Sequence, residues 1–198
     1  MTIKQALEAR LGALPHLWLN DVEVDPSSIR AILINEVVPA DPSQDFYGAI
    51  GEAYLSTTIP LFQQAGLAVQ SVQDILDMGV YITNAVKAPK TSYAIEKSAI
   101  EESLPCLEAE LALFPNVQVI LLCGDVAKKM LNMITKRATK KNVIPSGSTY
   151  KIRSEQYYWG DIRVMPSYII TGRNLLIEKS KMRMITEDIA AMAEIIRR

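Results

Sequence analysis

The chain is poor in the side chains that most often carry hydrolytic and metal chemistry. Its 198 residues include one histidine, His16, and two cysteines, Cys106 and Cys123. This inventory argues against a Ser-His-Asp triad and against a zinc site built from histidine and cysteine ligands. Two cysteines are also too few for a disulfide framework, and they do not form a C-x-x-C motif.

The chain lacks a long apolar segment as well. No apolar run reaches the roughly 18 residues that a membrane span needs. Residues 1–14 form an amphipathic stretch without the apolar centre of a signal peptide. Because 49% of the residues are hydrophobic, we expect a folded chain, and its length fits one domain over residues 1–198. We therefore expect a cytoplasmic protein with no membrane partner.

Basic residues are scarce in the first part of the chain, and acidic residues are scarce in the last part. Residues 1–117 contain 6 basic and 15 acidic residues, whereas residues 118–198 contain 15 basic and 7 acidic residues. The basic excess is densest over residues 128–141, where six lysines and arginines occur without an acid. Such a stretch suits a polyanionic partner. A solvated helix face with its following loop is an equally good interpretation.

Apolar periodicity alternates between strand and helix along the chain. Short buried runs predict four strands at residues 31–35, 80–83, 117–123 and 162–165. Amphipathic helices are expected between them and at the C-terminus, and residues 150–158 suit a strand or a hairpin arm. Pro105 is expected to kink or restart the helix predicted over residues 95–114. The pattern predicts an α/β fold with three α/β/α layers around a central, mostly parallel four-stranded sheet.

Polar side chains stand where two of these strands end. The first strand runs into Asn35 and Glu36, and the second ends on Asn84; the aromatic pair Phe46 and Tyr47 lies in the loop between them. Ligands of open α/β sheets gather at the carboxyl ends of strands. A carboxylate can hold a water there, a ring can stack on a base, and an amide can both donate and accept. Together these residues predict a nucleobase pocket.

Each of these residues also has a structural interpretation. Glu36 can be a solvated carboxylate at a loop entry, and Asn84 can cap the loop that follows it. Phe46 and Tyr47 can plug the core beneath their loop, as aromatic side chains often do. Ser167, which follows Pro166 in the sequence, is as well suited to a turn as to a ligand contact.

Five segments, in order, resemble motifs of the uracil-DNA glycosylase superfamily and are closest to its family 4. Residues 35–39 are similar to its Gly-Glu-Ala-Pro-Gly motif, with one residue inserted before the proline. Residues 46–51 match Phe-x-Gly-x-x-Gly, and residues 81–87 are close to Ile-Thr-Asn-x-Val-Lys. Residues 119–127 resemble its strand followed by Gly-x-x-Ala, and residues 164–168 resemble the approach to its last motif. The resemblance covers roughly residues 28–192.

The resemblance implies a role for each matched residue. Glu36 would position or activate a water, Phe46 would stack on a flipped base, and Asn84 would read the uracil edge. The substrate-binding set is completed by Asn35, Tyr47, Ser167 and Tyr168. Lys87 and Arg173 are expected to contact nucleic acid, Arg173 through a phosphate. The expected partner is DNA, or a free nucleobase; the oligomeric state is left open.

The chain departs from the family at two places. The family's last motif has a histidine that assists departure of the uracil anion, and neither Met165 nor Ile169, the two aligned positions, supplies one. A hydrogen-bond donor in residues 167–173 or their backbone would have to replace it. Family 4 also carries an iron–sulfur cluster with four cysteine ligands. Here Ala88 stands at one ligand position and Cys106 aligns with another, so we expect no cluster, no other metal and no cofactor.

Three hypotheses follow. The chain is a hydrolase that removes uracil or a related base from DNA, after the base has been flipped out of the stack. Alternatively it is a catalytically weak or inactive member of the superfamily that binds a nucleobase or nucleic acid. The third hypothesis is a flavodoxin-like domain for another small ligand. The sequence leaves open whether the protein is an enzyme.

Overall fold

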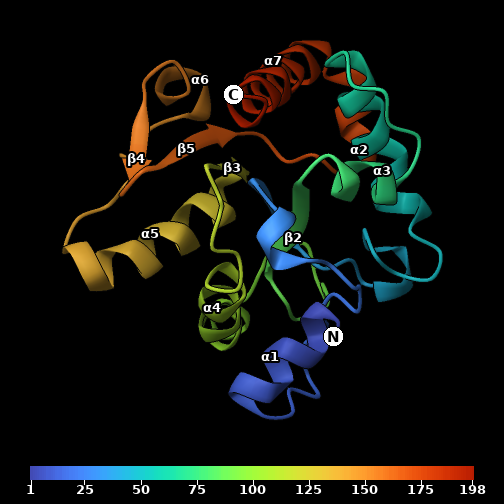
Figure 1. Cartoon of the computed structure of the whole chain (residues 1–198), viewed down its shortest axis with the longest axis vertical. Coiled ribbons are helices and arrows are strands. Elements are labelled where there is room, and N and C mark those ends of the chain that lie inside the picture. The colour runs from blue at the N-terminus through green and yellow to red at the C-terminus, as the bar shows by residue number, and fades with distance from the viewer.

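The structure is a computed structural model that describes residues 1–198, and a five-stranded sheet lies at its centre (Figure 1). The strand order is β2-β1-β3-β5-β4. The first four of these strands run parallel, and β4 pairs antiparallel with β5. The strands are β1 (Ala31–Val37), β2 (Val80–Val86), β3 (Val119–Cys123), β4 (Tyr157–Trp159) and β5 (Ile162–Ser167).

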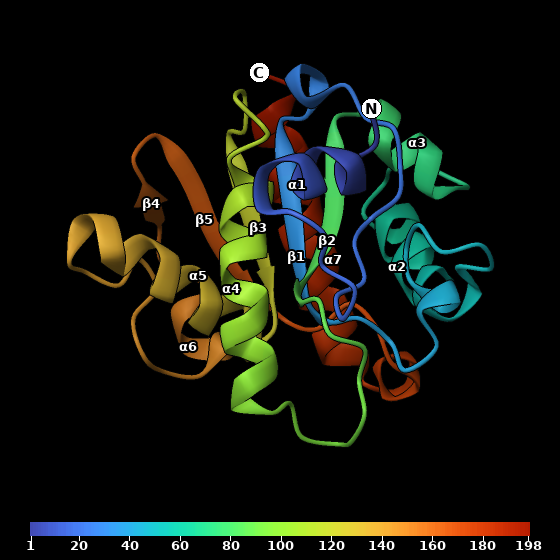
Figure 2. The ribbon, with the colours of Figure 1, turned by 90° about the horizontal axis from the view of Figure 1, so that it is seen from below.

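Helices cover both faces of the sheet and complete three layers. Helices α1, α4 and α5 pack on one face, and α2 and α7 pack on the other. Figure 2 shows α4 in front of the sheet and α7 behind it. None of the helices is long and apolar enough to span a membrane. The helices are α1 (Ile3–Leu11), α2 (Glu52–Gln64), α3 (Val72–Asp77), α4 (Lys97–Leu111), α5 (Asp125–Thr139), α6 (Thr149–Ile152) and α7 (Lys179–Ile196), with 3-10 turns at Pro26–Ser28, Pro42–Gln44 and Arg173–Ile177.

This architecture confirms the α/β fold class and corrects three details. The sheet has five strands where we expected four, because the three residues of β4 pair with β5 at the sheet edge. The start of the segment predicted as a strand or hairpin arm forms α6. Pro105 does not interrupt α4, which runs on to Leu111. Its ring lies on the exposed side of the helix, where water can satisfy the carbonyl that loses its partner.

Alternation along β1 decides which way its polar end points. Ile32 and Ile34 belong to the core beneath α4 and α5, whereas Ala31 and Leu33 belong to the core beneath α2 and α7. Both faces are apolar because a parallel sheet is covered on both sides. Successive side chains of a strand point to opposite faces. Asn35 and Glu36, although adjacent, therefore face different layers.

Candidate functional site

A cavity of about 670 Å³ lies at the edge of the sheet where β1, β3 and β5 end. Parallel strands bring their carboxyl ends to this edge, which is where open α/β sheets bind ligands. Its volume is within the range of small-molecule sites. We call it the Glu36 cavity; it is lined by Glu36, Lys90, Asp125, Gly147, Ser148, Thr149, Tyr168, Ile169, Thr171, Gly172, Arg173, Asn174, Leu175, Glu178 and Lys181.

Glu36 is held at the N-terminus of α5. Its Oε2 accepts a hydrogen bond of 3.0 Å from the backbone N–H of Val126. Gly124, with φ of 119°, leaves the space for this approach, because a Cβ there would come within 2.6 Å of the Glu36 Cγ. The carboxyl is half-buried, and burial raises its pKa, against the opposing effects of the Val126 bond and of Lys128 and Lys90. The carboxylate is thus fixed in one orientation on the cavity wall.

A buried network of amide side chains lies on the other face of β1. The Asn84 Nδ2 donates to Asp45 Oδ1 at 2.9 Å, and Asn35 Nδ2 donates to Asn84 Oδ1 at 3.2 Å. Asn35 also donates to the Thr171 hydroxyl at 3.2 Å and accepts from the Ile170 N–H at 3.4 Å. The network therefore fastens the loop after β5, which lines the cavity, to the two central strands. Both amides are about 1% exposed and do not line the cavity.

Phe46 is buried, and Tyr47 is partly buried against the core. Phe46 is 1% exposed and packs against Tyr54 with ring centroids 5.2 Å apart. Tyr47 stacks on Tyr81, and its hydroxyl accepts a hydrogen bond of 3.0 Å from the Ile82 N–H. Because β2 is an edge strand, this hydroxyl satisfies a donor that no neighbouring strand can reach. Neither ring lines the Glu36 cavity.

Two further predicted residues face buried partners. Ser167 is fully buried, and its hydroxyl donates to the Asp188 carboxylate at 2.6 Å. Lys87 is 2% exposed, and its ammonium group pairs with Glu110 and donates to the Thr83 hydroxyl. With its charge and donors used inside the fold, Lys87 cannot reach a phosphate. The structure thus gives Lys87 a structural role in place of the expected contact with nucleic acid.

Three of the nine predicted site residues line the cavity: Glu36, Tyr168 and Arg173. Asn35 reaches its wall through Thr171. The other residues of the cavity come from loops and helix ends that the sequence does not place beside β1. They include four charged side chains that sequence reasoning missed, namely Lys90, Asp125, Glu178 and Lys181.

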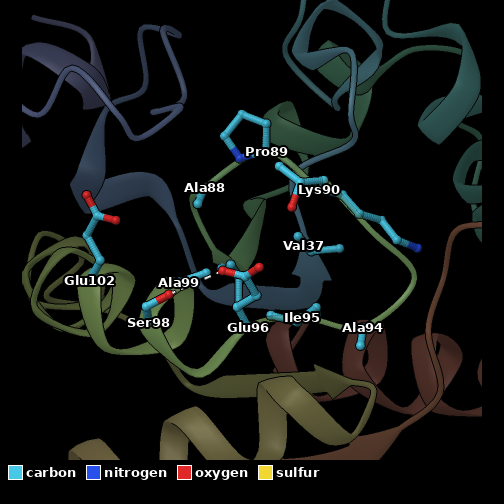
Figure 3. Close-up of a pocket in the computed structure, with 12 residues that line it drawn as sticks. Val37, Ala88, Pro89, Lys90, Ala94, Ile95, Glu96, Ser98, Ala99 and Glu102 are labelled. Atoms are coloured by element: carbon cyan, nitrogen blue, oxygen red, sulfur yellow. Dashed lines mark hydrogen bonds between the residues drawn. The ribbon is translucent and has the colours of Figure 1, made fainter.

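A smaller cavity of about 170 Å³ lies beside the first (Figure 3). Figure 3 shows it between residues 88–90 on one side and residues 94–99 at the start of α4 on the other. Small side chains and two acids, Glu96 and Glu102, line much of it, and Lys90 is the residue it shares with the Glu36 cavity. It offers no carboxylate fixed by a backbone donor, so the Glu36 cavity is the stronger candidate site.

The basic stretch of the sequence runs along α5, next to the Glu36 cavity. A groove lined by Lys129 and Lys136, among others, shares Asp125 and Gly147 with that cavity. Lys128 is buried, with its ammonium group bound to Asp125 at 2.7 Å and to the Thr149 hydroxyl. Positive charge therefore continues from the cavity onto a neighbouring groove.

The comparisons with known proteins show the family of the chain. A family model described as the uracil DNA glycosylase superfamily matches residues 35–188. The chain belongs to this superfamily. Solved structures that resemble it include the solution NMR structure of a candidate uracil DNA glycosylase from Methanosarcina acetivorans, at 12% sequence identity and a TM-score of 0.45. That likeness covers 85% of this chain and 93% of that chain. No curated protein matches the chain.

All residues that line the Glu36 cavity lie inside the segment matched by the superfamily model. The iron–sulfur cluster of the family 4 branch does not fit this member of the superfamily. Cys106 and Cys123 are the only thiols, and they lie in the cores on opposite faces of the sheet. Burial raises the pKa of Cys106 to about 11, which disfavours the thiolate that a cluster binds.

Asp45 is a residue whose importance the sequence did not show. Its position in a loop, directly before Phe46, suits a turn-forming residue and gives no other signal. The structure buries it completely, with Oδ1 bonded to Asn84 and to the Phe46 N–H and with Oδ2 lacking any hydrogen-bond partner. Burial raises its pKa from 3.8 to about 6, although the Asn84 and Phe46 bonds and Lys87 oppose the shift.

Replacing Asp45 with asparagine tests this burial through the pH dependence of stability. In the wild type the folded state binds a proton more tightly than the unfolded state, so stability from this group falls as pH rises from about 4 to about 6. The shift corresponds to roughly 3 kcal/mol. We therefore expect Asp45→Asn to gain stability relative to wild type between pH 4 and pH 7, measured by urea unfolding. An equal change in Asp41→Asn, made in the same loop, would contradict the assignment to Asp45.

Proposed function

We propose that the protein is a DNA N-glycosylase that hydrolyses the bond between deoxyribose and uracil or a related base. The observation that carries the proposal is the half-buried Glu36 carboxylate, fixed by the Val126 N–H on the wall of a cavity at the carboxyl edge of the sheet. The target bond is unreachable inside a stacked duplex, so the base would be flipped into the Glu36 cavity. Membership of the uracil DNA glycosylase superfamily supports this choice of substrate.

Glu36 would position the water that attacks the sugar. Cleavage leaves positive charge on the sugar and negative charge on the base, and a nearby carboxylate stabilises the first and orients the water. The base needs hydrogen-bond donors. Thr171, Asn174 and the backbone N–H groups of the loop after β5 are among the donors that line the cavity. Each donor at a developing anion is typically worth about 10²–10³ in rate, so these groups can compensate for the missing histidine.

The amide network would support this chemistry by holding the loop after β5 in position. Asn84 is bonded to Asp45 and Asn35, and Asn35 in turn holds Thr171 and Ile170. In this conformation Asn84 acts on the cavity through the position of the loop, and the edge of the base is read by the groups that line the cavity. The resemblance to family 4 gave Asn84 direct contact with uracil. We keep Asn84 in the site but give it an indirect role, through Asn35 and the loop after β5.

Cations at the rim would hold the DNA backbone. Lys90, Arg173 and Lys181 line the Glu36 cavity, and Lys129 and Lys136 line the groove beside it. Lysine and arginine contacts to phosphates position a protein on DNA and make its affinity fall as salt rises. We therefore expect the affinity for DNA to fall steeply between about 50 and 200 mM salt, as it does for proteins that contact several phosphates.

A cleavage assay on a uracil-containing single strand tests the proposal. We expect the wild type, in molar excess, to create abasic sites that alkali converts to strand breaks at the uracil position. The same strand with thymine in place of uracil should stay intact. No breaks at high enzyme excess would contradict a glycosylase activity on uracil.

The same assay separates a second candidate function, a binder without turnover. That candidate rests on the position of Asn84, whose amide bonds to Asp45 and Asn35 inside the fold, and on the buried Phe46. Retained affinity for the uracil strand in a gel-shift experiment, without any abasic product, would identify the protein as a nucleic-acid-binding member of the superfamily.

A further inference from the structure

Exposed tyrosines adjoin the Glu36 cavity on two sides. Tyr93 is 98% exposed in the segment between β2 and α4. Tyr150 is 72% exposed on α6, and it directly follows Thr149, which lines the cavity. Neither hydroxyl makes a hydrogen bond within the chain, and neither ring packs on another aromatic ring. The fold itself therefore makes little use of these two rings.

Cations stand beside the rings. The Lys90 Nζ lies 5.7 Å from the centroid of the Tyr93 ring, and the Lys181 Nζ lies 5.7 Å from that of Tyr168. Both lysines and Tyr168 line the Glu36 cavity. Proteins that bind single strands combine aromatic faces, on which bases stack, with cations that follow the phosphates. The rim of the cavity has both components within a few residues of each other.

The two exposed tyrosines stand apart, with the cavity between them. Tyr93 follows β2, and Tyr150 belongs to α6 on the β5 side; β1 and β3 lie between those strands. Neighbouring strands are about 4.8 Å apart, so three steps of the sheet separate the two sides by roughly 14 Å. Figure 2 agrees, with the loop that enters α4 on one side of that helix and α6 on the other. A nucleotide bound at Glu36 has room for a neighbour at each ring.

We infer that Tyr93 and Tyr150 stack on the unpaired bases that flank the target nucleotide, so that single-stranded DNA is the substrate this site prefers. The choice of DNA rests on the proposed function. In a duplex the faces of the flanking bases are covered by their neighbours, and a tyrosine can reach them only where the stack is open. The tyrosine rings therefore add binding to a single strand that they do not add to a duplex.

Binding of strands that contain no uracil tests the inference without any turnover. The probe is a fluorescent 12-nucleotide single strand of mixed sequence, compared with its duplex by fluorescence anisotropy at fixed salt. We expect the wild type to bind the single strand more tightly. Tyr93→Ala and Tyr150→Ala should each weaken that binding about 5–100-fold, the range that loss of one stacked base implies. Their affinity for the duplex should stay close to that of the wild type.

Two control variants isolate stacking. Tyr158 is 54% exposed, and Arg163 lies 5.9 Å from its ring, but it belongs to β4, paired with the start of β5 and away from the cavity. Tyr158→Ala should therefore bind the single strand as the wild type does. Tyr93→Phe keeps the ring and should also retain affinity. Equal wild-type affinity for strand and duplex, or losses in the alanine variants no larger than in Tyr158→Ala, would overturn the inference.

The outcomes also separate this inference from the proposed function. Affinity for a single strand that depends on both tyrosines, without abasic product from a uracil strand, would keep the inference and remove the glycosylase activity. Abasic product, together with alanine variants that bind the single strand as the wild type does, would keep the glycosylase activity and overturn the inference. Where the protein is active, Tyr93→Ala should raise the substrate concentration for half-maximal rate and leave the saturated rate unchanged.

Discussion

Replacing Glu36 with glutamine is expected to slow release of the base by about 10²–10⁴-fold, the usual contribution of a positioned acid–base group. Glutamine keeps the size of the side chain and an oxygen for the Val126 N–H, which now lies 3.0 Å from the carboxylate. It removes the negative charge that orients water and stabilises the cationic sugar. The measurement is the single-turnover rate on a uracil-containing single strand with enzyme in excess.

Glu102→Gln is the matched control for this prediction. Glu102 lines the smaller cavity shown in Figure 3 and is exposed at the start of α4. If the Glu36 cavity holds the reaction, Glu102→Gln should keep the wild-type rate. A large loss in Glu102→Gln, with Glu36→Gln unaffected, would move the site to the smaller cavity. Equal rates in both variants and the wild type would make Glu36 a structural carboxylate.

The pH profile gives Glu36 a second signature. Burial raises its pKa, so its carboxylate forms at a higher pH than that of an exposed glutamate. The reaction needs the carboxylate, and the wild-type rate should therefore rise as pH passes through this pKa. Glu36→Gln should lose that limb of the profile. Burial also raises the pKa of Asp45, to about 6, so Asp45 can add a limb of its own; a profile of Asp45→Asn that keeps the wild-type limb would assign that limb to Glu36.

The strands were predictable because their local sequence and their environment agree. The run from Val119 to Cys123 is apolar throughout, as a strand covered on both faces must be, and the structure buries all of it. The edge strand β4 was predicted only as part of a longer strand or hairpin arm over residues 150–158, since three residues form it and its pairing with β5 decides its conformation. Short edge strands depend on tertiary contacts that no local pattern encodes.

The candidate site was predictable at its edge of the sheet but not in its arrangement. The sequence places Glu36 and Asn84 at the ends of adjacent strands, yet the alternation of β1 turns Glu36 to one face while Asn84 bonds to Asn35 on the other. The lining residues Lys90 and Lys181 arrive from segments whose course depends on the packing of α4 and α7. Their place at the cavity follows from tertiary structure alone.

The burial of Lys87 has a signal in the sequence. Its partner, Glu110, lies on the buried, mostly apolar side of α4 that carries Cys106 and Leu107. An acid on such a side needs a partner of opposite charge, because an unpaired buried charge is very costly. The partner itself could not be identified, since 23 residues separate the two and several cations were available.

Replacing Glu110 with glutamine is expected to lower the free energy of unfolding by about 3–5 kcal/mol, the cost of breaking a buried pair from one side. Glu110 is 1% exposed and accepts hydrogen bonds from Lys87, Thr83 and Tyr81. Glutamine keeps an acceptor but leaves the Lys87 charge without a counter-charge in the core. Urea unfolding at pH 7 measures the loss.

The control lies two residues earlier on the same helix. Glu108 pairs with Arg137 at 3.2 Å, but both side chains are about half exposed. Such pairs contribute about 0–1 kcal/mol, so Glu108→Gln should change stability little. A comparable loss in both variants would mean that the substitution disturbs α4 itself and does not report on burial.

The double variant Lys87→Met with Glu110→Gln decides whether charge is the cause. With both charges removed, the core no longer holds an unpaired ion, and the double variant should recover much of the stability that Glu110→Gln loses. The glutamine oxygen still accepts from Tyr81, which now donates to the Glu110 carboxylate at 2.7 Å. Neighbouring residues with a shared interaction give non-additive effects in such a cycle. Strictly additive losses would show that Lys87 and Glu110 stabilise the fold independently, and the ion pair would then not be what holds β2 against α4.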